Sequence, residues 1–241
     1  MKSIKNGIAK ILRLTIGRKP KYFKNIPIII NNYNRLTTLK KLTNYLEING
    51  YTNIYILDNQ SSYPPLLDFY QTCEYRVFSL KKNYGSKALW KSGIWLKFMF
   101  SNFVYTDSDV LPVDECPNDF LEYFYKLLVK YPNIHKVGFS IKIDDLPDTF
   151  INKSKVINWE KRYYNKEIEN NIYLAPIDTT FALYRPFSKS GRRDDNAPIL
   201  RVGFPYQIRH LPWYIDNNKL DLEEEFYINS LKKRTHWSRQ N

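Results

Sequence analysis

Short apolar segments alternate with helix-like segments between residues 26 and 107, and this alternation constrains the fold more than any other feature. The expected strands cover residues 26–30, 53–57, 75–80 and 103–106, and the expected helices between them cover residues 36–47, 66–70 and 88–100. Strands and helices that alternate at this spacing form βαβ units, in which helices cover both faces of a parallel sheet. The first half of the chain is therefore predicted to be α/β.

The second half of the chain has a less regular pattern. We expect helices over residues 119–130 and 220–233, and strands over residues 136–143 and 181–184. The segment NWEKRYY (158–164) fits a helix or a loop, and the polar segment SKSGRRDDNAP (188–198) fits a flap. Because we find no internal repeat and no linker, residues 25–241 are expected to form one domain after a basic segment of residues 1–24.

The charge balance is strongly basic, with a formal net charge of +13 over 241 residues. Nucleic acid, anionic lipid and phosphorylated substrates all attract such a chain, and charge alone does not choose among them. Cys73 and Cys116 lack C-x-x-C spacing, which argues against a disulfide framework or a zinc cage and favours a reducing, cytoplasmic compartment. No run of about 18 apolar residues occurs, so no membrane-spanning helix is expected.

The N-terminal segment carries Ile4, Ile8 and Ile11 near helical spacing, with basic residues between them. Lys10 and Arg13 interrupt the apolar stretch, and no small-residue cleavage site follows, which argues against a signal peptide. Two interpretations remain open. The segment is a basic amphipathic helix in peripheral contact with the anionic inner face of a membrane, or it packs on its own domain with solvated charges.

Two acidic residues, Asp107 and Asp109, follow the fourth expected strand, and polar residues follow the other three. In open α/β sheets, ligands bind beyond the carboxyl ends of the strands. Side chains at i and i+2 of an extended segment point to the same side, so both carboxylates can face one point. Such close charges repel unless a cation lies beside them, and Mg²⁺ or Mn²⁺ combines carboxylate oxygens with substrate phosphates. The pattern favours a metal and diphosphate site over a surface turn in which Asp109 caps the next element.

Four motifs occur in order in the first half: IIINNYNR (28–35), Asp58, NYGSKALW (83–90) and YTDSD (105–109). In this order they resemble the motifs of GT-A glycosyltransferases, particularly family 2-like enzymes of bacterial or viral glycan synthesis. The resemblance implies a GT-A type, Rossmann-like nucleotide-binding sandwich with a mixed, mostly parallel central sheet. It assigns the nucleotide-sugar-binding half to residues 25–112 and the acceptor-binding half to residues 113–241.

The resemblance also implies an activity, the metal-dependent transfer of a sugar from a nucleotide diphosphate sugar to a hydroxyl of a glycan or lipid-linked acceptor. A UDP-sugar is the expected donor. Asp109, Asp107 and His210 are the expected ligands of Mn²⁺ or Mg²⁺, and the alternative for His210 is packing against Trp213 and Tyr214. The expected nucleotide-sugar contacts are Asn32, Asn34, Arg35, Asp58, Asn83, Lys87, Asp107 and Ser108.

An inverting transferase needs a carboxylate that deprotonates the acceptor hydroxyl. The glutamate–aspartate pair that commonly supplies this base in family 2 has no clear counterpart in this chain. The candidates are Asp144, Asp145, Asp178, Asp194 and Asp195. We favour Asp145 and Asp178 as catalytic residues because they lie beside expected strands.

Two rival classes of function remain open. The basic composition suggests a nucleic-acid-binding protein, although no nucleic-acid-binding motif is recognisable and we expect no nucleic-acid partner. A two-metal phosphotransferase or nuclease could use the four carboxylates of Asp107, Asp109, Asp144 and Asp145. Release of UDP from UDP-sugars in the presence of Mn²⁺ separates a glycosyltransferase from a nuclease.

Overall fold

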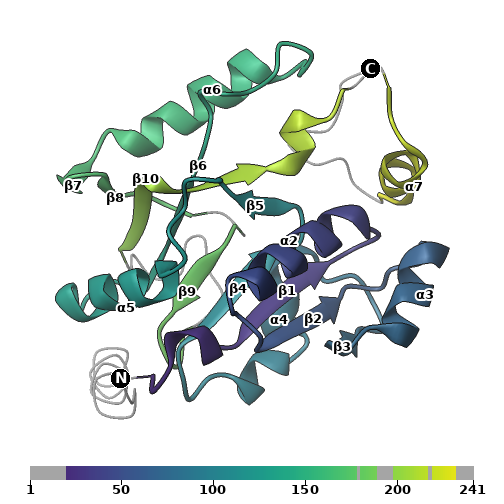
Figure 1. Ribbon diagram of the computed structural model, residues 1–241, viewed down its shortest axis with the longest axis horizontal. Helices are drawn as coiled ribbons and strands as arrows, with labels where there is room; N and C mark the ends of the chain where they lie inside the picture. Colours follow the sequence, from purple (N-terminus) through teal and green to yellow (C-terminus); the bar gives the residue numbers. More distant parts are fainter. Residues whose placement is uncertain (1–19, 178–179, 189–197, 217–218, 232–241) are drawn as a thin grey trace, which may run out of the picture.

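The computed structural model describes residues 20–177, 180–188, 198–216 and 219–231. Within these residues, ten strands form one sheet in the order β3-β2-β1-β4-β9-β6-β10-β8-β7, and β5 pairs with β10 (Figure 1). The strands are β1 (Ile28–Asn32), β2 (Ile54–Asp58), β3 (Arg76–Ser79), β4 (Phe103–Asp107), β5 (Val110–Pro112), β6 (Lys136–Ile141), β7 (Glu167–Glu169), β8 (Ile172–Leu174), β9 (Ala182–Tyr184) and β10 (Ile199–His210).

The sheet has a parallel part and a mixed part. Strands β3, β2, β1 and β4 are parallel to their neighbours, as the alternation of the first half predicts. Beyond β4, strand β9 runs antiparallel to both β4 and β6, whereas β6 and β10 are parallel. The predicted α/β class with a mixed central sheet is therefore confirmed.

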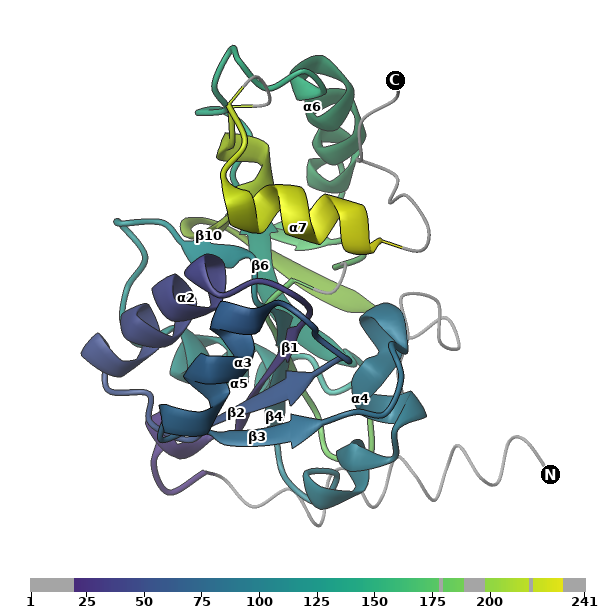
Figure 2. The ribbon, with the colours of Figure 1, turned by 90° about the vertical axis from the view of Figure 1, so that its right-hand side faces the viewer.

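Helices cover both faces of the parallel strands. On β1, Ile28 and Ile30 belong to one buried core, whereas Ile29 belongs to a second core on the opposite face. The first core includes side chains of α2 (Thr37–Ile48), α3 (Pro64–Thr72) and α5 (Phe120–Lys130), and the second includes side chains of α4 (Ala88–Lys91). Figure 2 shows α2 and α3 on one side of the strands and α4 on the other. Burial on both faces explains why β1 and β4 are apolar up to their polar ends, whereas the edge strand β3 begins and ends with exposed residues.

The helix expected over residues 88–100 is wrong in its length. Helix α4 ends at Lys91, Gly93 adopts a left-handed φ of 79°, and the short 3-10 helix η3 (Ile94–Lys97) follows. Glycine enters the left-handed region without the steric penalty of a Cβ atom, which is why helices often end at such a residue.

Strand β10 is twelve residues long and is absent from the expected pattern. Its register with β6 shifts between Val202 and Gln207, across a segment that contains the cis Phe204–Pro205 bond. After the shift the strand continues and pairs antiparallel with β5. Strand β10 thereby links the mixed part of the sheet to the segment that follows Asp109.

The segment NWEKRYY is helical, because α6 (Lys153–Lys161) continues into the 3-10 helix η4 (Arg162–Tyr164). The last described helix, α7 (Leu222–Ser230), is shorter than the range expected from the sequence. None of the described helices is both long enough and apolar enough to cross a membrane. Residues 1–19, which include most of the basic N-terminal segment, and residues 189–197 of the expected flap lie outside the described residues.

Candidate functional site

The carboxyl ends of β1, β2 and β4 bring polar residues together at one edge of the sheet. Asn31 is the register partner of Asp107 across β1 and β4, and Asn32 is the partner of Asp58 across β1 and β2. Asn31 Nδ2 donates a hydrogen bond to Asp107 Oδ1 over 3.0 Å. The buried Oδ1 atoms of Asn31 and Asn32 accept no hydrogen bond from the described residues. Buried acceptors normally have a hydrogen-bond partner, so these two oxygen atoms can still accept hydrogen bonds from a polar ligand.

Asp107 is the last residue of β4, and Asp109 lies in the two-residue connection between β4 and β5. Thr106 and Ser108 are buried, whereas the two aspartates are half-buried, and the chain bends at residues 108 and 109. The Asp109 side chain is 17% exposed, so its carboxylate is still reachable. Ser108 is 3% exposed, so the contact expected between Ser108 and the donor requires some opening of the site.

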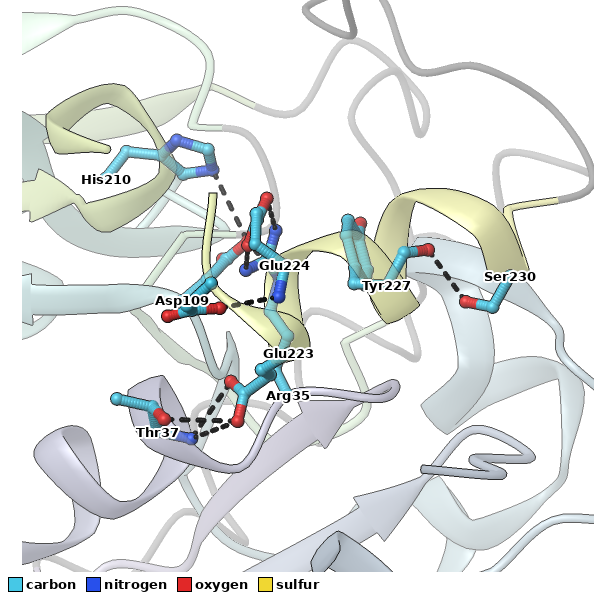
Figure 3. A network of polar contacts seen from close by, with 9 residues as sticks. Arg35, Thr37, Asp109, His210, Glu223, Glu224, Tyr227 and Ser230 are labelled. Carbon is cyan, nitrogen blue, oxygen red and sulfur yellow. Dashed lines mark hydrogen bonds and ion pairs between the residues drawn. The ribbon is translucent and has the colours of Figure 1, made fainter. Parts of the chain in front are cut away.

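The guanidinium group of Arg35 lies between two carboxylates (Figure 3). Its Nη1 and Nη2 atoms donate hydrogen bonds to Glu224 over 2.5 and 3.1 Å, and its Nε atom lies 3.8 Å from Asp109 Oδ2. The ring of Tyr227 lies against the same group, with its centre 3.8 Å from Arg35 Cζ. Burial alone would lower the pKa of Arg35, but Asp109 and Glu224 together raise that pKa above its ordinary value. Arg35 is therefore a fixed positive charge at the end of β1.

His210, at the end of β10, lies close to Asp109. Its Nε2 atom lies 3.7 Å from Asp109 Oδ2. Antiparallel pairing of His210 with Val110 fixes this position, and the Leu211 N–H group donates to the Asp109 carbonyl over 2.8 Å. The imidazole also packs against Trp213 with 4.8 Å between ring centres, as the packing alternative expects, and the metal role of His210 stays a prediction.

Asn34 follows β1 with a left-handed φ of 51°, a conformation that asparagine tolerates better than most residues. Its Oδ1 atom accepts hydrogen bonds from the N–H groups of Ser62 and Tyr63 over 2.6 and 3.0 Å. Its Nδ2 atom donates to Ser230 Oγ over 2.9 Å. The Asn34 side chain thus connects the loop after β1 to residues 62–63 and to Ser230, and Ser230 is the only one of these partners that belongs to α7.

Asp58, at the end of β2, is a buried carboxylate. It accepts hydrogen bonds from the Ser61 N–H group over 3.2 and 3.3 Å and from the Tyr70 hydroxyl over 3.4 Å. Asn32 Nδ2 donates to the same Tyr70 hydroxyl over 2.8 Å, which connects two residues expected to bind the nucleotide. Burial raises the pKa of Asp58, and the hydrogen bonds from Ser61 and Tyr70 offset part of that rise.

Asn83 and Lys87 lie in the turn between β3 and α4. Asn83 Oδ1 accepts a hydrogen bond from the Gly85 N–H group over 2.8 Å, and the Asn83 N–H group donates to Gln60 Oε1 over 3.1 Å. Asn83 is exposed, and Lys87 is the exposed last residue of the 3-10 helix η2 (Gly85–Lys87). Both side chains are accessible to a ligand that extends past β2 and β3.

The two favoured catalytic carboxylates remain predictions. Asp178 lies outside the described residues. Asp145 accepts hydrogen bonds from Arg209 Nε over 2.9 Å and from the Tyr214 hydroxyl over 2.5 Å. Consecutive strand residues point to opposite faces, so Arg209, which binds Asp145, and His210, which approaches Asp109, leave β10 on different faces. Each oxygen of the Asp145 carboxylate therefore already accepts one hydrogen bond, from the Tyr214 hydroxyl and from Arg209.

The donor set at Asp109 fits a divalent ion that takes most of its ligands from substrate and water. Asp109 and His210 supply oxygen and nitrogen donors 3.7 Å apart, and Asp107 lies two residues away. The described residues contain no group of three or more His, Cys, Asp or Glu side chains arranged to hold an ion, so the expected set of Asp109, Asp107 and His210 is not brought together as one group. Mg²⁺ commonly binds through one or two carboxylates together with substrate phosphates, and imidazole is a suitable additional ligand for Mn²⁺.

The sequence pattern did not indicate that Glu224 and Tyr227 belong to this site. The only signal for them is a helix start, because Asp221 Oδ1 accepts a hydrogen bond from the Glu224 N–H group over 2.8 Å, as a capping aspartate does. Such a signal predicts where α7 begins but not what it contacts.

No protein-family model and no curated protein matches this chain. Solved structures with partial likeness include glucosyl-3-phosphoglycerate synthase from Mycobacterium tuberculosis in complex with phosphoglyceric acid, at a TM-score of 0.40 and 13% identity, over 69% of this chain and 62% of that one. GalNAc-T7 with UDP, GalNAc and Mn²⁺ has a TM-score of 0.48 and 15% identity, over 77% of this chain and 43% of that one. Residues 1–349 of TarS from S. aureus give a TM-score of 0.43 and 13% identity, over 77% and 60%.

The likeness thus spans less than two thirds of each of these three proteins. At such identities and TM-scores it does not decide the activity of this chain, and the fold described above rests on its own strand order and register.

Proposed function

We propose that the chain is a metal-dependent glycosyltransferase that moves a sugar from a nucleotide diphosphate sugar, expected to be a UDP-sugar, to a hydroxyl of a glycan or lipid-linked acceptor. The observation that carries the proposal is the convergence at Asp109. Its Oδ2 atom lies 3.7 Å from His210 Nε2 and 3.8 Å from Arg35 Nε, beside the carboxyl ends of parallel strands. Open α/β sheets bind ligands at this edge, and these groups suit an ion-bound diphosphate.

In this proposal, Asp109 and His210 bind Mn²⁺ or Mg²⁺, and Asp107 faces the ribose. The ion, when bound, offsets the negative charge of the departing diphosphate. Arg35 contributes a second, permanent positive charge beside Asp109. Asp145 or Asp178 takes the proton of the acceptor hydroxyl. The remaining donor contacts are assigned to Asn32, Asn34, Asp58, Asn83, Lys87 and Ser108.

A panel of UDP-, GDP- and CMP-sugars with Mn²⁺ or Mg²⁺ tests the proposal. The expected result is thermal stabilisation by at least one donor, together with slow release of its nucleoside diphosphate, or of CMP from a CMP-sugar. Asp109→Asn should abolish both effects, whereas Asp68→Asn, on the exposed surface of α3, should leave both unchanged. A flat response of the wild-type protein across the whole panel would overturn the proposal.

Two further measurements address the basic charge. Steep, salt-dependent binding of generic DNA or RNA at physiological salt, without any donor response, would favour the nucleic-acid-binding alternative. Co-sedimentation of the full chain with anionic but not with neutral vesicles is expected if the N-terminal segment contacts a membrane surface. Equal recovery with both kinds of vesicle would contradict the membrane contact alone.

A further inference from the structure

Helix α7 covers the end of β1 and contacts nearly every residue of the loop that follows. The Tyr33 hydroxyl donates to the Ser230 carbonyl over 3.0 Å, and Asn34 Nδ2 donates to Ser230 Oγ over 2.9 Å. Arg35 binds Glu224 through two hydrogen bonds, as described above. Figure 3 shows Arg35 beside Glu224 and Tyr227 of α7. The loop that is expected to receive a nucleotide is therefore occupied by a helix of the same chain.

The N-terminal turn of α7 also binds the N-terminus of α2. Both carboxylate oxygens of Glu223 accept from the Thr37 N–H group over 3.0 Å, and Thr37 Oγ1 donates to the same carboxylate over 3.1 Å. The first N–H groups of a helix have no partner within the helix, and a carboxylate there also benefits from the helix dipole. Glu223 thus caps α2 from a distant part of the chain.

Polar contacts, rather than hydrophobic burial, hold α7 against the sheet edge. Glu223 is the only residue of α7 that is buried. Leu222 and Ile228 are 81% and 41% exposed, and no side chain of α7 belongs to either buried core. Helices in folded proteins owe most of their stability to the packing of an apolar face. The main apolar contact of α7 is the packing of Phe226 against Tyr63, which borders the first core, with 5.0 Å between ring centres. Because no side chain of α7 lies within either core, the helix can leave the strand ends by breaking this ring contact and the polar contacts above.

The exposure of Arg35 shows why α7 has to move. The Arg35 side chain is 5% exposed, and the groups that cover it are Glu224 and Tyr227 of α7. A ligand from solvent cannot reach this guanidinium while both remain in place. Carboxylate and phosphate groups bind a guanidinium in the same two-pronged geometry, so a phosphate can replace Glu224 without rearrangement of Arg35.

We propose that α7 is a polar latch that closes the Asp109 site, and that a diphosphate opens it by displacing Glu224 from Arg35. The proposal rests on the proposed function for the identity of the ligand, a nucleoside diphosphate group. In the closed state Glu224 occupies the anion position on Arg35. In the open state the ligand takes that position, and Tyr227 leaves the guanidinium.

The test uses the full chain, Glu224→Gln and a matched control. Glu225→Gln makes the same chemical change one residue away, at an exposed position of α7. Inorganic pyrophosphate and UDP are titrated calorimetrically with Mn²⁺ present, and hydrogen exchange of the α7 amides is followed with and without each ligand. We expect Glu224→Gln to bind both ligands about tenfold more tightly, because one competing charged hydrogen-bond partner is lost. Glu225→Gln should match the wild type.

Hydrogen exchange of the wild-type protein tests the latch without any substitution, so the test still works if Glu224→Gln folds poorly. The latch predicts that saturating UDP accelerates exchange in α7 while the amides of β1 and β4 stay protected. Unchanged or slower α7 exchange at saturation would overturn the latch. So would equal affinities of Glu224→Gln and Glu225→Gln, or the absence of pyrophosphate and UDP binding in every variant.

Failure of the latch and failure of the proposed function give different results. If donor sugars are hydrolysed but α7 stays protected, the latch is wrong and the glycosyltransferase proposal stands. If pyrophosphate opens α7 but no nucleotide sugar is hydrolysed, the latch stands as an anion-operated device and the proposed function is wrong.

Discussion

The ion pair between Arg35 and Glu224 contributes to the free energy that keeps α7 closed, and a double-mutant cycle measures this contribution. The side chains are 5% and 12% exposed, so the pair is largely removed from water. Removal of one partner from a rigid buried pair costs about 3–5 kcal/mol, because the remaining charge stays buried. If α7 can leave the strand ends, the Arg35 guanidinium becomes hydrated and keeps Asp109 as a partner at 3.8 Å. Both effects reduce the free-energy cost of removing Glu224.

The expected coupling free energy is therefore the net free energy of hydrogen bonds to charged groups, measured relative to the same groups hydrated by water. Such bonds contribute about 1.5–3 kcal/mol, and the observed distances of 2.5 and 3.1 Å are in the range of good charge-assisted bonds. We expect a coupling free energy of about 2 kcal/mol for Arg35→Met and Glu224→Gln, with the double variant more stable than the sum of the single losses predicts.

Urea unfolding of the wild type, both single variants and the double variant at neutral pH gives this coupling from four midpoints and slopes. A coupling below about 0.5 kcal/mol is typical of an exposed pair and would show that Arg35 and Glu224 do not hold α7. A loss of about 5 kcal/mol in Glu224→Gln alone would show that α7 is a permanent part of the fold. Either result would refute the reasoning that makes α7 a latch.

Two further predictions concern buried charges. Burial raises the pKa of Asp58. The Asp58 side chain therefore contributes most to stability below its unfolded pKa of about 4, and this contribution is lost as pH rises through the folded pKa. Asp58→Asn, which can still accept from the Ser61 N–H group, should increase the free energy of unfolding at pH 7 but not at pH 3. A similar gain in the exposed control Asp68→Asn would contradict this cause. Glu160→Gln should lower the free energy of unfolding by about 3–5 kcal/mol because Arg201, 1% exposed and 2.6 Å from Glu160, keeps an unpaired buried charge. Replacement of both residues, Glu160→Leu with Arg201→Met, should restore most of the loss, and urea midpoints that show no such recovery would contradict the explanation.

The parallel half of the fold could be predicted because its local pattern and its burial agree. Strands such as 26–30 and 103–106 are uninterrupted apolar runs that end in polar residues, and the structure buries them on both faces. Boundaries moved by one or two residues, which is the usual uncertainty of element ends. The exception, the helix over 88–100, ended early because Gly93 takes a left-handed conformation that the apolar pattern does not encode.

Strand β10 could not be predicted because its sequence contradicts the pattern of a buried strand. It contains a buried arginine, Arg201, and a proline, and its register with β6 shifts partway along. Arg201 is acceptable inside the sheet only because Glu160 of α6 pairs with it from a distant segment. Proline is tolerated where the ladder of hydrogen bonds is already interrupted. Both compensations are tertiary, and the local sequence gives no sign of either.

The same division applies to the site. The positions of Asp107, Asp109 and Asp58 follow from strand ends that meet at one edge, and His210 was expected near Asp109 only from the resemblance. Glu224 lies 189 positions from Arg35 in the chain, and α7 shows no apolar periodicity that would indicate a partner. A polar contact between such distant segments becomes visible only when the sheet is folded.

The latch and the donor compete for the same atoms, and this competition has a calculable effect on affinity. A closing free energy of about 2 kcal/mol leaves about 3% of the chains open, which weakens the apparent affinity for a ligand of the open state about thirtyfold. Loss of the Glu224 carboxylate recovers only part of this factor, because Ser230 still binds Asn34 and Glu223 still caps α2. Because these contacts still favour the closed state in Glu224→Gln, we expect its affinity for the ligand to rise about tenfold rather than thirtyfold.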